Sequence, residues 1–79
     1  MKNIENILAK LERADMLIRL EATGTPVEFA LTLNISRASL FRLIDEIKFL
    51  GAPVKYSKTR RSYYYEYPVK TKLRSNGQK

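Results

Sequence analysis

Apolar residues recur at helical spacing over most of this chain, and the pattern changes to alternation after residue 53. A first helix is expected at about 3–22, where the apolar face collects Ile4, Ile7, Leu8, Leu11, Ala14, Ile18 and Ala22. A second, shorter helix is expected at 26–33. A third is expected at about 36–50, with a stripe formed by Leu40, Leu43, Ile44, Ile47 and Leu50.

The break between the first two helices carries several helix-boundary signals in a row. Gly24 suits the end of a helix, and Thr25 is a good N-cap for the next one. Pro26 fits the first helical position, where its missing N–H costs nothing, and Glu28 completes a capping box with Thr25.

The third helix has equally clear boundaries. Asn34 tolerates the positive φ of a tight turn, and Ser36 can accept a free backbone N–H as N-cap. Gly51 is expected to end the helix in a left-handed conformation, and Pro53 prevents it from continuing.

The segment at about 53–67 predicts a β-hairpin. A short alternating run is followed by a polar turn at 57–61 and a tyrosine-rich strand closed by Pro68. We expect Tyr63 and Tyr65 to face inward and Tyr64 and Glu66 to face outward. A less favoured interpretation is a stacking platform on which these tyrosines bind single-stranded nucleic acid.

Composition excludes most catalytic chemistry. The 79 residues contain neither Cys nor His and only three glycines. Thiol or Ser-His-Asp catalysis, the usual zinc sites and Gly-rich phosphate loops are therefore not expected, and we assign no catalytic residue, metal or cofactor. No apolar run approaches a membrane span and no secretory leader is recognisable, so we expect a cytoplasmic, nucleoid-associated protein.

Charge is distributed unevenly along the chain. Residues 1–54 balance seven basic against seven acidic residues, whereas 55–79 hold eight basic residues and only Glu66. The whole net charge of +7 therefore lies in the last third, which suggests a polyanionic partner or merely a solvated basic end. Residues 69–79 are expected to form a flexible basic tail after a single domain at 1–68.

The two short helices and their turn resemble the DNA-binding helix-turn-helix family. The residues that fit its pattern are Ala30, Asn34, Ile35, Leu40 and Leu43, with Asn34 standing where Gly is commonest. Together with the hairpin, the chain resembles the winged helix subclass, like the N-terminal domains of bacterial transcriptional repressors. The resemblance implies a mainly α fold, a three-helix helix-turn-helix core with a small C-terminal β-hairpin as wing. No effector domain is expected.

This resemblance implies sequence-specific binding of double-stranded DNA and transcription regulation. The third helix would enter the major groove, while the wing would reach the backbone or minor groove. The expected DNA-binding residues are Ser36, Arg37, Ala38, Ser39, Phe41, Arg42, Asp45, Lys58, Arg60 and Arg61. Arg42 is the candidate for bidentate guanine contact, and Asp45 is expected either to pair with Arg42 or to accept from cytosine.

Three alternatives stay open. Met16, Leu17 and Leu20 lie off the main stripe of the first helix, which favours core packing or else a homodimer through that helix. A protein-interaction winged helix would instead dock a partner on Phe41 and Phe49. A non-specific architectural nucleic-acid binder would depend on charge without reading bases.

Overall fold

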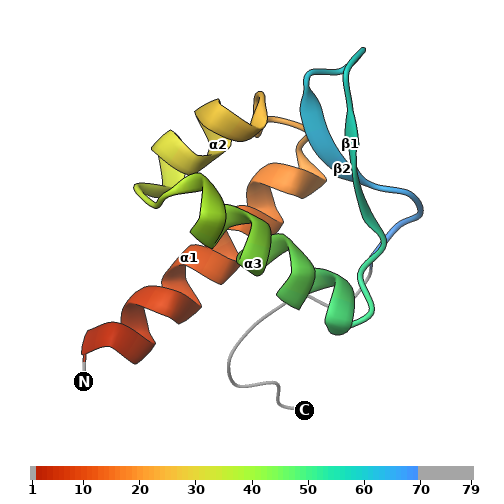
Figure 1. Ribbon diagram of the computed structural model, residues 1–79. Coiled ribbons are helices and arrows are strands. Elements are labelled where there is room, and N and C mark those ends of the chain that lie inside the picture. The colour runs from red at the N-terminus through yellow and green to blue at the C-terminus, as the bar shows by residue number, and fades with distance from the viewer. Residues whose placement is uncertain (1, 70–79) are drawn as a thin grey trace.

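Three helices are followed by one antiparallel hairpin (Figure 1). The computed structural model describes residues 2–69, with side chains from residue 8 onward. Its elements are α1 (Lys2–Arg19), α2 (Pro26–Leu33), α3 (Arg37–Phe49), β1 (Val54–Ser57) and β2 (Ser62–Tyr65). The predicted fold class is confirmed: a helix-turn-helix core, mainly α, with a small hairpin in the wing position after it. Of the predicted tail at 69–79, residues 70–79 lie outside the described residues, as do the side chains of Ile4 and Ile7.

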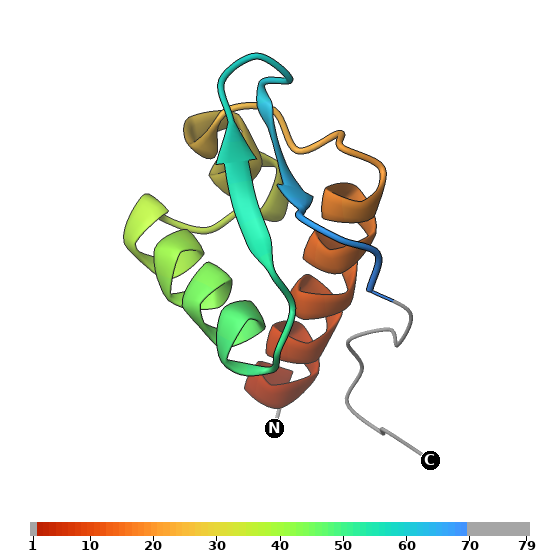
Figure 2. The same ribbon diagram turned by 90° about the vertical axis from the view of Figure 1, so that its right-hand side faces the viewer.

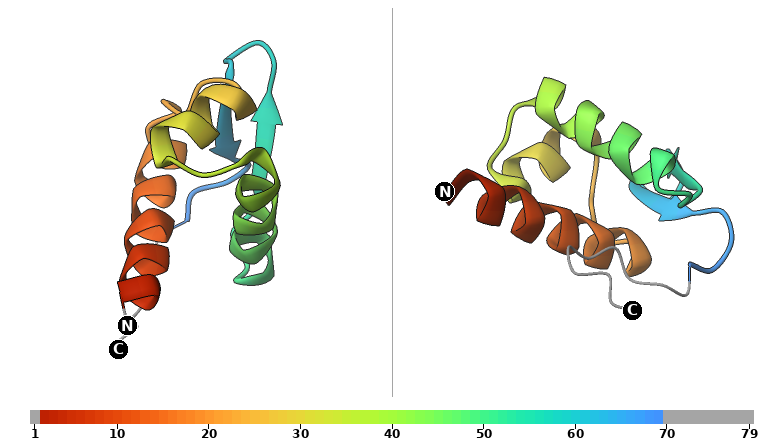
Figure 3. Two further views of the ribbon diagram at one scale, coloured as in Figure 1. Left: turned by 60° about the vertical axis from the view of Figure 1, so that its left-hand side comes forward. Right: turned by 90° about the horizontal axis from the view of Figure 1, so that it is seen from below.

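The hairpin covers the side on which α1 and α3 lie apart (Figure 2). Seen from below, α1 and α3 form opposite sides of the domain (Figure 3). The core between them is apolar and consists of Ala14, Ile18, Phe29, Ala30, Leu33, Leu40, Ile44, Ile47, Ala52, Val54 and Tyr63. Since every helix and both strands contribute to it, the hairpin is part of the fold and not an appendage.

All three helices end through a residue in the left-handed conformation. Asn34 (φ 59°) and Gly51 (φ 99°) occupy this position as predicted. The first helix forms, but its predicted end at about residue 22 was wrong: α1 ends at Arg19, Glu21 takes the left-handed conformation (φ 54°), and Ala22 is exposed outside the helix. The Ala22 and Glu21 N–H groups donate to the Leu17 and Ile18 carbonyls, which closes the helix in a Schellman motif.

Gly24 has a different role from the predicted one. It has φ +74°, and a Cβ added there would lie 2.4 Å from Glu28 Oε1. That oxygen accepts the Thr25 N–H at 2.8 Å, while Thr25 Oγ1 accepts the Glu28 N–H at 3.3 Å. Gly24 therefore leaves room for the capping box, which the structure confirms.

The hairpin is shorter than the predicted 53–67. Val54 pairs with Tyr65 and Ser57 with Ser62, so residues 58–61 form the turn. The Glu66 N–H still donates to the Pro53 carbonyl at 2.8 Å, beyond the last strand residues. Tyr63 faces the core as predicted, and Tyr65 packs partly buried against it.

A buried hydroxyl pair joins the α1–α2 loop to β2. Thr23 Oγ1 accepts the Tyr63 N–H at 2.9 Å, and Ser62 Oγ accepts the Thr23 N–H at 3.1 Å. The two hydroxyl oxygens lie 3.1 Å apart, and both residues are buried. Side-chain hydroxyls thus join the α1–α2 loop to β2, in place of the backbone-to-backbone hydrogen bonds that a third strand would form.

A second polar cluster fixes α1 against the hairpin. Asp15 is buried, and its carboxylate accepts from the Tyr65 hydroxyl at 2.6 Å and from Arg19 Nε at 3.0 Å. Arg19 also donates to the Val69 carbonyl. Burial, followed by the hydrogen bond to Asp15, raises the pKa of Tyr65, so the phenol stays protonated and acts as donor.

Candidate functional site

The outward face of α3 carries most of the residues expected to bind DNA. Arg37, Ala38, Phe41, Arg42 and Asp45 are all exposed, because the apolar stripe on the other side of the helix anchors it in the core. At 1.5 Å per residue, the 13 residues of α3 extend for about 20 Å. The helix therefore presents a long, convex surface to any partner.

The start of α3 is held by serine hydroxyls. Ser36 is the N-cap as predicted, and its hydroxyl accepts the Ser39 N–H at 3.1 Å. Ser36 Oγ also lies within hydrogen-bond distance, 3.1 Å, of Ser39 Oγ, to which it donates. Both hydrogen bonds of Ser36 thus go to Ser39, and the Ser39 hydroxyl proton is not used in this pair.

Arg42 lies beside a groove between α1 and α3. The groove has a volume of about 330 Å³ and is lined by Lys10, Ile35, Ser39, Arg42, Leu43 and Glu46. The ion pairs of residues 8–69 join Asp15 to Arg19, Lys55 to Glu66 and Glu21 to Arg60, so the predicted alternative of an Arg42–Asp45 pair is not formed. The Arg42 guanidinium is accordingly free to contact a partner.

The hairpin turn is connected to the α1–α2 loop. Lys58, Arg60 and Arg61 are all exposed, as expected. Arg60 is nevertheless engaged: its Nε lies 3.5 Å from Glu21 Oε1, and its guanidinium lies 4.2 Å from the centre of the Tyr64 ring. Binding a phosphate through Arg60 would therefore compete with Glu21, whereas Lys58 and Arg61 have no ion pair among the described residues.

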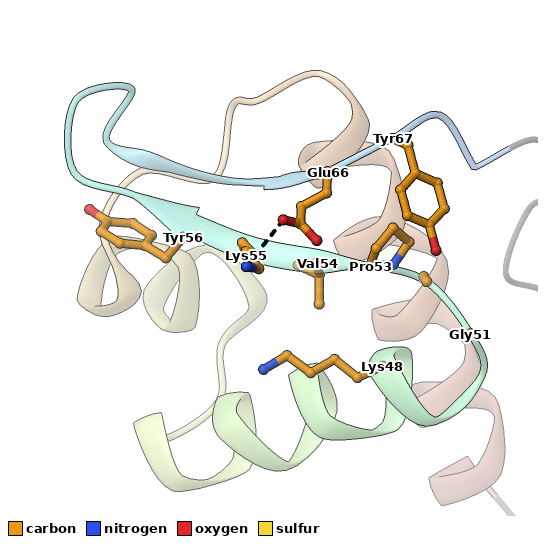
Figure 4. Close-up of a pocket in the computed structure, with 9 residues that line it drawn as sticks. Lys48, Gly51, Pro53, Val54, Lys55, Tyr56, Glu66 and Tyr67 are labelled. Atoms are coloured by element: carbon orange, nitrogen blue, oxygen red, sulfur yellow. Dashed lines mark ion pairs between the residues drawn. The ribbon is translucent and has the colours of Figure 1, made fainter.

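A second groove, between α3 and β1, was not predicted from the sequence (Figure 4). Its volume is about 590 Å³, and it is lined by Lys48, Gly51, Ala52, Pro53, Val54, Lys55, Tyr56, Glu66 and Tyr67. Lys48 extends from α3 below the strand, and Lys55 Nζ lies 3.1 Å from Glu66 Oε2. Two lysines from different elements thus border one groove.

Exposed apolar side chains form the other conspicuous feature. Phe49, on the outward side of α3, is 86% exposed, and Phe41 is 49% exposed. On the outer side of α1 and just beyond its end, Met16 is 56% exposed and Leu20 is 67% exposed, whereas Leu17 packs against the core. Leu17 thus follows the core-packing alternative, and Met16 and Leu20 are left to solvent.

Residues 8–69 contain no group of three or more Asp and Glu side chains that could hold a metal ion. No helix of the described chain is long and apolar enough to cross a membrane. Searches of protein-family models, curated proteins and solved structures each find no match to this chain.

Proposed function

We propose that this protein binds double-stranded DNA in a sequence-specific manner and acts as a small transcription regulator. The observation that carries the proposal is the outward face of α3, where Arg37 and Arg42 are exposed without an ion pair among the described residues. A major groove about 12 Å wide admits an α-helix, and arginine is the commonest reader of guanine there. Such a protein would work at the nucleoid, in the cytoplasm.

The hairpin supports the same proposal. Its turn supplies Lys58 and Arg61 to a phosphate backbone or to a minor groove, where arginine is favoured. Arg60 would join them by exchanging Glu21 for a phosphate. Contacts of this kind position the protein on DNA, whereas Arg42 on α3 would select the sequence.

Selection from a random pool of duplexes at near-physiological salt tests the proposal. Wild type should enrich a defined motif, and Arg42→Ala should blur it at one or two positions, at a cost of about 1–3 kcal/mol on the preferred site. Arg13→Ala is the matched control, because Arg13 is exposed on α1, outside the α3 face and the hairpin. Wild type that enriches no sequence would contradict base readout.

A homodimer through α1 would give such a protein a longer site. Met16 and Leu20 supply exposed apolar surface for it. The selected motif should then be an inverted repeat with half-sites about one DNA turn apart. Sedimentation that shows a monomer at high micromolar concentration would contradict the dimer while leaving DNA binding intact.

Protein docking is the second candidate function, and the exposure of Phe49 favours it. Leu50 next to it is also exposed, and contiguous exposed apolar surface marks protein-interaction sites. If Phe41 and Phe49 dock a protein, wild type should recover no duplex at all from the pool. Phe49→Ala should then remove partner binding and leave folding unchanged.

A further inference from the structure

The groove between α3 and β1 has an unpaired cation on one wall and an exchangeable one on the other. Lys48 is exposed, and residues 8–69 offer it no ion pair. Lys55 is held by Glu66, but both side chains of this pair are roughly half exposed, so water and salt weaken it. An anion that enters the groove can therefore bind Lys48 directly, and it can bind Lys55 after displacing Glu66 from the ion pair.

The strand wall adds a backbone donor. In an antiparallel pair of strands, opposite residues alternate between hydrogen-bonded and non-hydrogen-bonded pairs. The Glu66 N–H donates to the Pro53 carbonyl, so the pairs 55/64 and 57/62 are hydrogen-bonded as well. Tyr56, opposite Tyr63, then directs its backbone N–H away from β2, to the open edge of β1. Backbone N–H groups and lysines are the groups that hold phosphate oxygens in protein–DNA complexes.

The position of the groove indicates which anion it takes. It separates α3, which we propose for the major groove, from the hairpin, which we propose for the backbone or minor groove (Figure 4). A duplex that contacts both elements must pass one phosphate strand between them. An acidic peptide would match the charge too, but nothing on this surface requires it to pass there.

We infer that this groove is a phosphodiester seat: Lys48, Lys55 and the Tyr56 N–H hold one DNA strand, and Glu66 competes with that strand for Lys55. The inference rests on the proposed DNA-binding function and adds residues to it that differ from those on the outward face of α3. Glu66 then lowers the affinity for every DNA sequence alike, because a phosphate that binds Lys55 must first break the Lys55–Glu66 ion pair.

The test measures affinity for one selected duplex between 50 and 200 mM salt, by fluorescence anisotropy. Lys48→Gln should reduce the slope of log affinity against log salt by about 0.9. The fourfold rise in salt should then lower its affinity by about 3.5-fold less than it lowers that of wild type. Lys55→Gln should weaken binding as well, whereas Glu66→Gln should tighten it. Arg13→Gln, with the same charge change on α1, should leave the slope unchanged.

Failure of the inference and failure of the proposed function give different results. If wild type binds duplexes but Lys48→Gln has the slope of Arg13→Gln, or Glu66→Gln weakens binding, the phosphodiester seat is wrong and the DNA-binding function stands. The phosphodiester seat is also wrong if an acidic peptide displaces the duplex while Lys48→Gln leaves the salt slope of DNA binding unchanged. If wild type binds no duplex, both fall together. Thermal melting of each variant shows that loss of folding does not cause the effect.

Discussion

The Thr23–Ser62 pair should be a major contributor to the stability of this small domain. Both residues are buried, and each hydroxyl accepts a buried backbone N–H at about 3 Å. Thr23→Val keeps the shape of the side chain but leaves the Tyr63 N–H without its acceptor. Ser62→Ala does the same to the Thr23 N–H. A buried donor that loses its partner costs about 1–3 kcal/mol, so each variant should lose that much unfolding free energy.

A double-mutant cycle in urea measures whether the two hydroxyls act as one unit. Because they also contact each other at 3.1 Å, the double variant should lose about 0.5–1.5 kcal/mol less than the two single losses combined. In thermal melting, each 1 kcal/mol should lower Tm by about 4–8 °C. Thr32→Val, at an exposed position on α2, is the matched control and should stay within about 0.5 kcal/mol of wild type. Single losses below about 0.5 kcal/mol, with strict additivity, would show that the two hydroxyls do not stabilise the domain as a unit.

Three further variants test other contacts of the fold. The hydrogen bond from the Thr25 N–H lowers the pKa of Glu28. The capping box should therefore stabilise the protein above the pKa of an unfolded glutamate and lose this effect as pH falls. In thermal melting at pH 3–6, the Tm of Glu28→Gln should depend less on pH than that of wild type. Glu21→Gly should have an unfolding free energy about 1 kcal/mol higher than Glu21→Ala in urea titrations, because both variants lack the ion pair with Arg60 and only glycine adopts φ 54° without strain; equal values would show that this position is not strained. Tyr65→Phe should lower the unfolding free energy by about 1.5–3 kcal/mol in the same assay, since it removes a donor to the buried Asp15 carboxylate. An unchanged unfolding free energy would show that the hydrogen bond from Arg19 alone is enough to stabilise this carboxylate.

The helix-turn-helix could be predicted because its signals are local. Thr25, Ser36 and Asn34 each act within a few residues of their own position, through a cap or a left-handed turn. The outward face of α3 follows from the same local periodicity, which fixes the buried stripe and leaves Arg37 and Arg42 outside. That part of the candidate site needed no knowledge of tertiary contacts.

The features that the sequence did not reveal depend on residues far apart in the chain. Thr23 meets Ser62 across 39 positions, and nothing near Thr23 marks it as an acceptor for β2. The end of α1 was misplaced for a related reason: Gly24 carries the usual signal, but Glu21 takes the left-handed conformation under the Schellman hydrogen bonds. The groove beside Lys48 likewise exists only once β1 has docked against α3.

An amide-shift titration of ¹⁵N-labelled protein with a selected duplex shows residue by residue which surface of the protein binds DNA. We predict that the largest changes fall on Ser36, on residues 37–45 of α3, on the hairpin turn at 58–61 and on the Tyr56 amide in the groove, with little change around Met16 on the outer side of α1. Changes centred on Phe49 and Leu50 that leave Arg42 and the turn unaffected would rule out DNA binding through the outward face of α3, and would instead identify the end of α3 as the surface that contacts the partner.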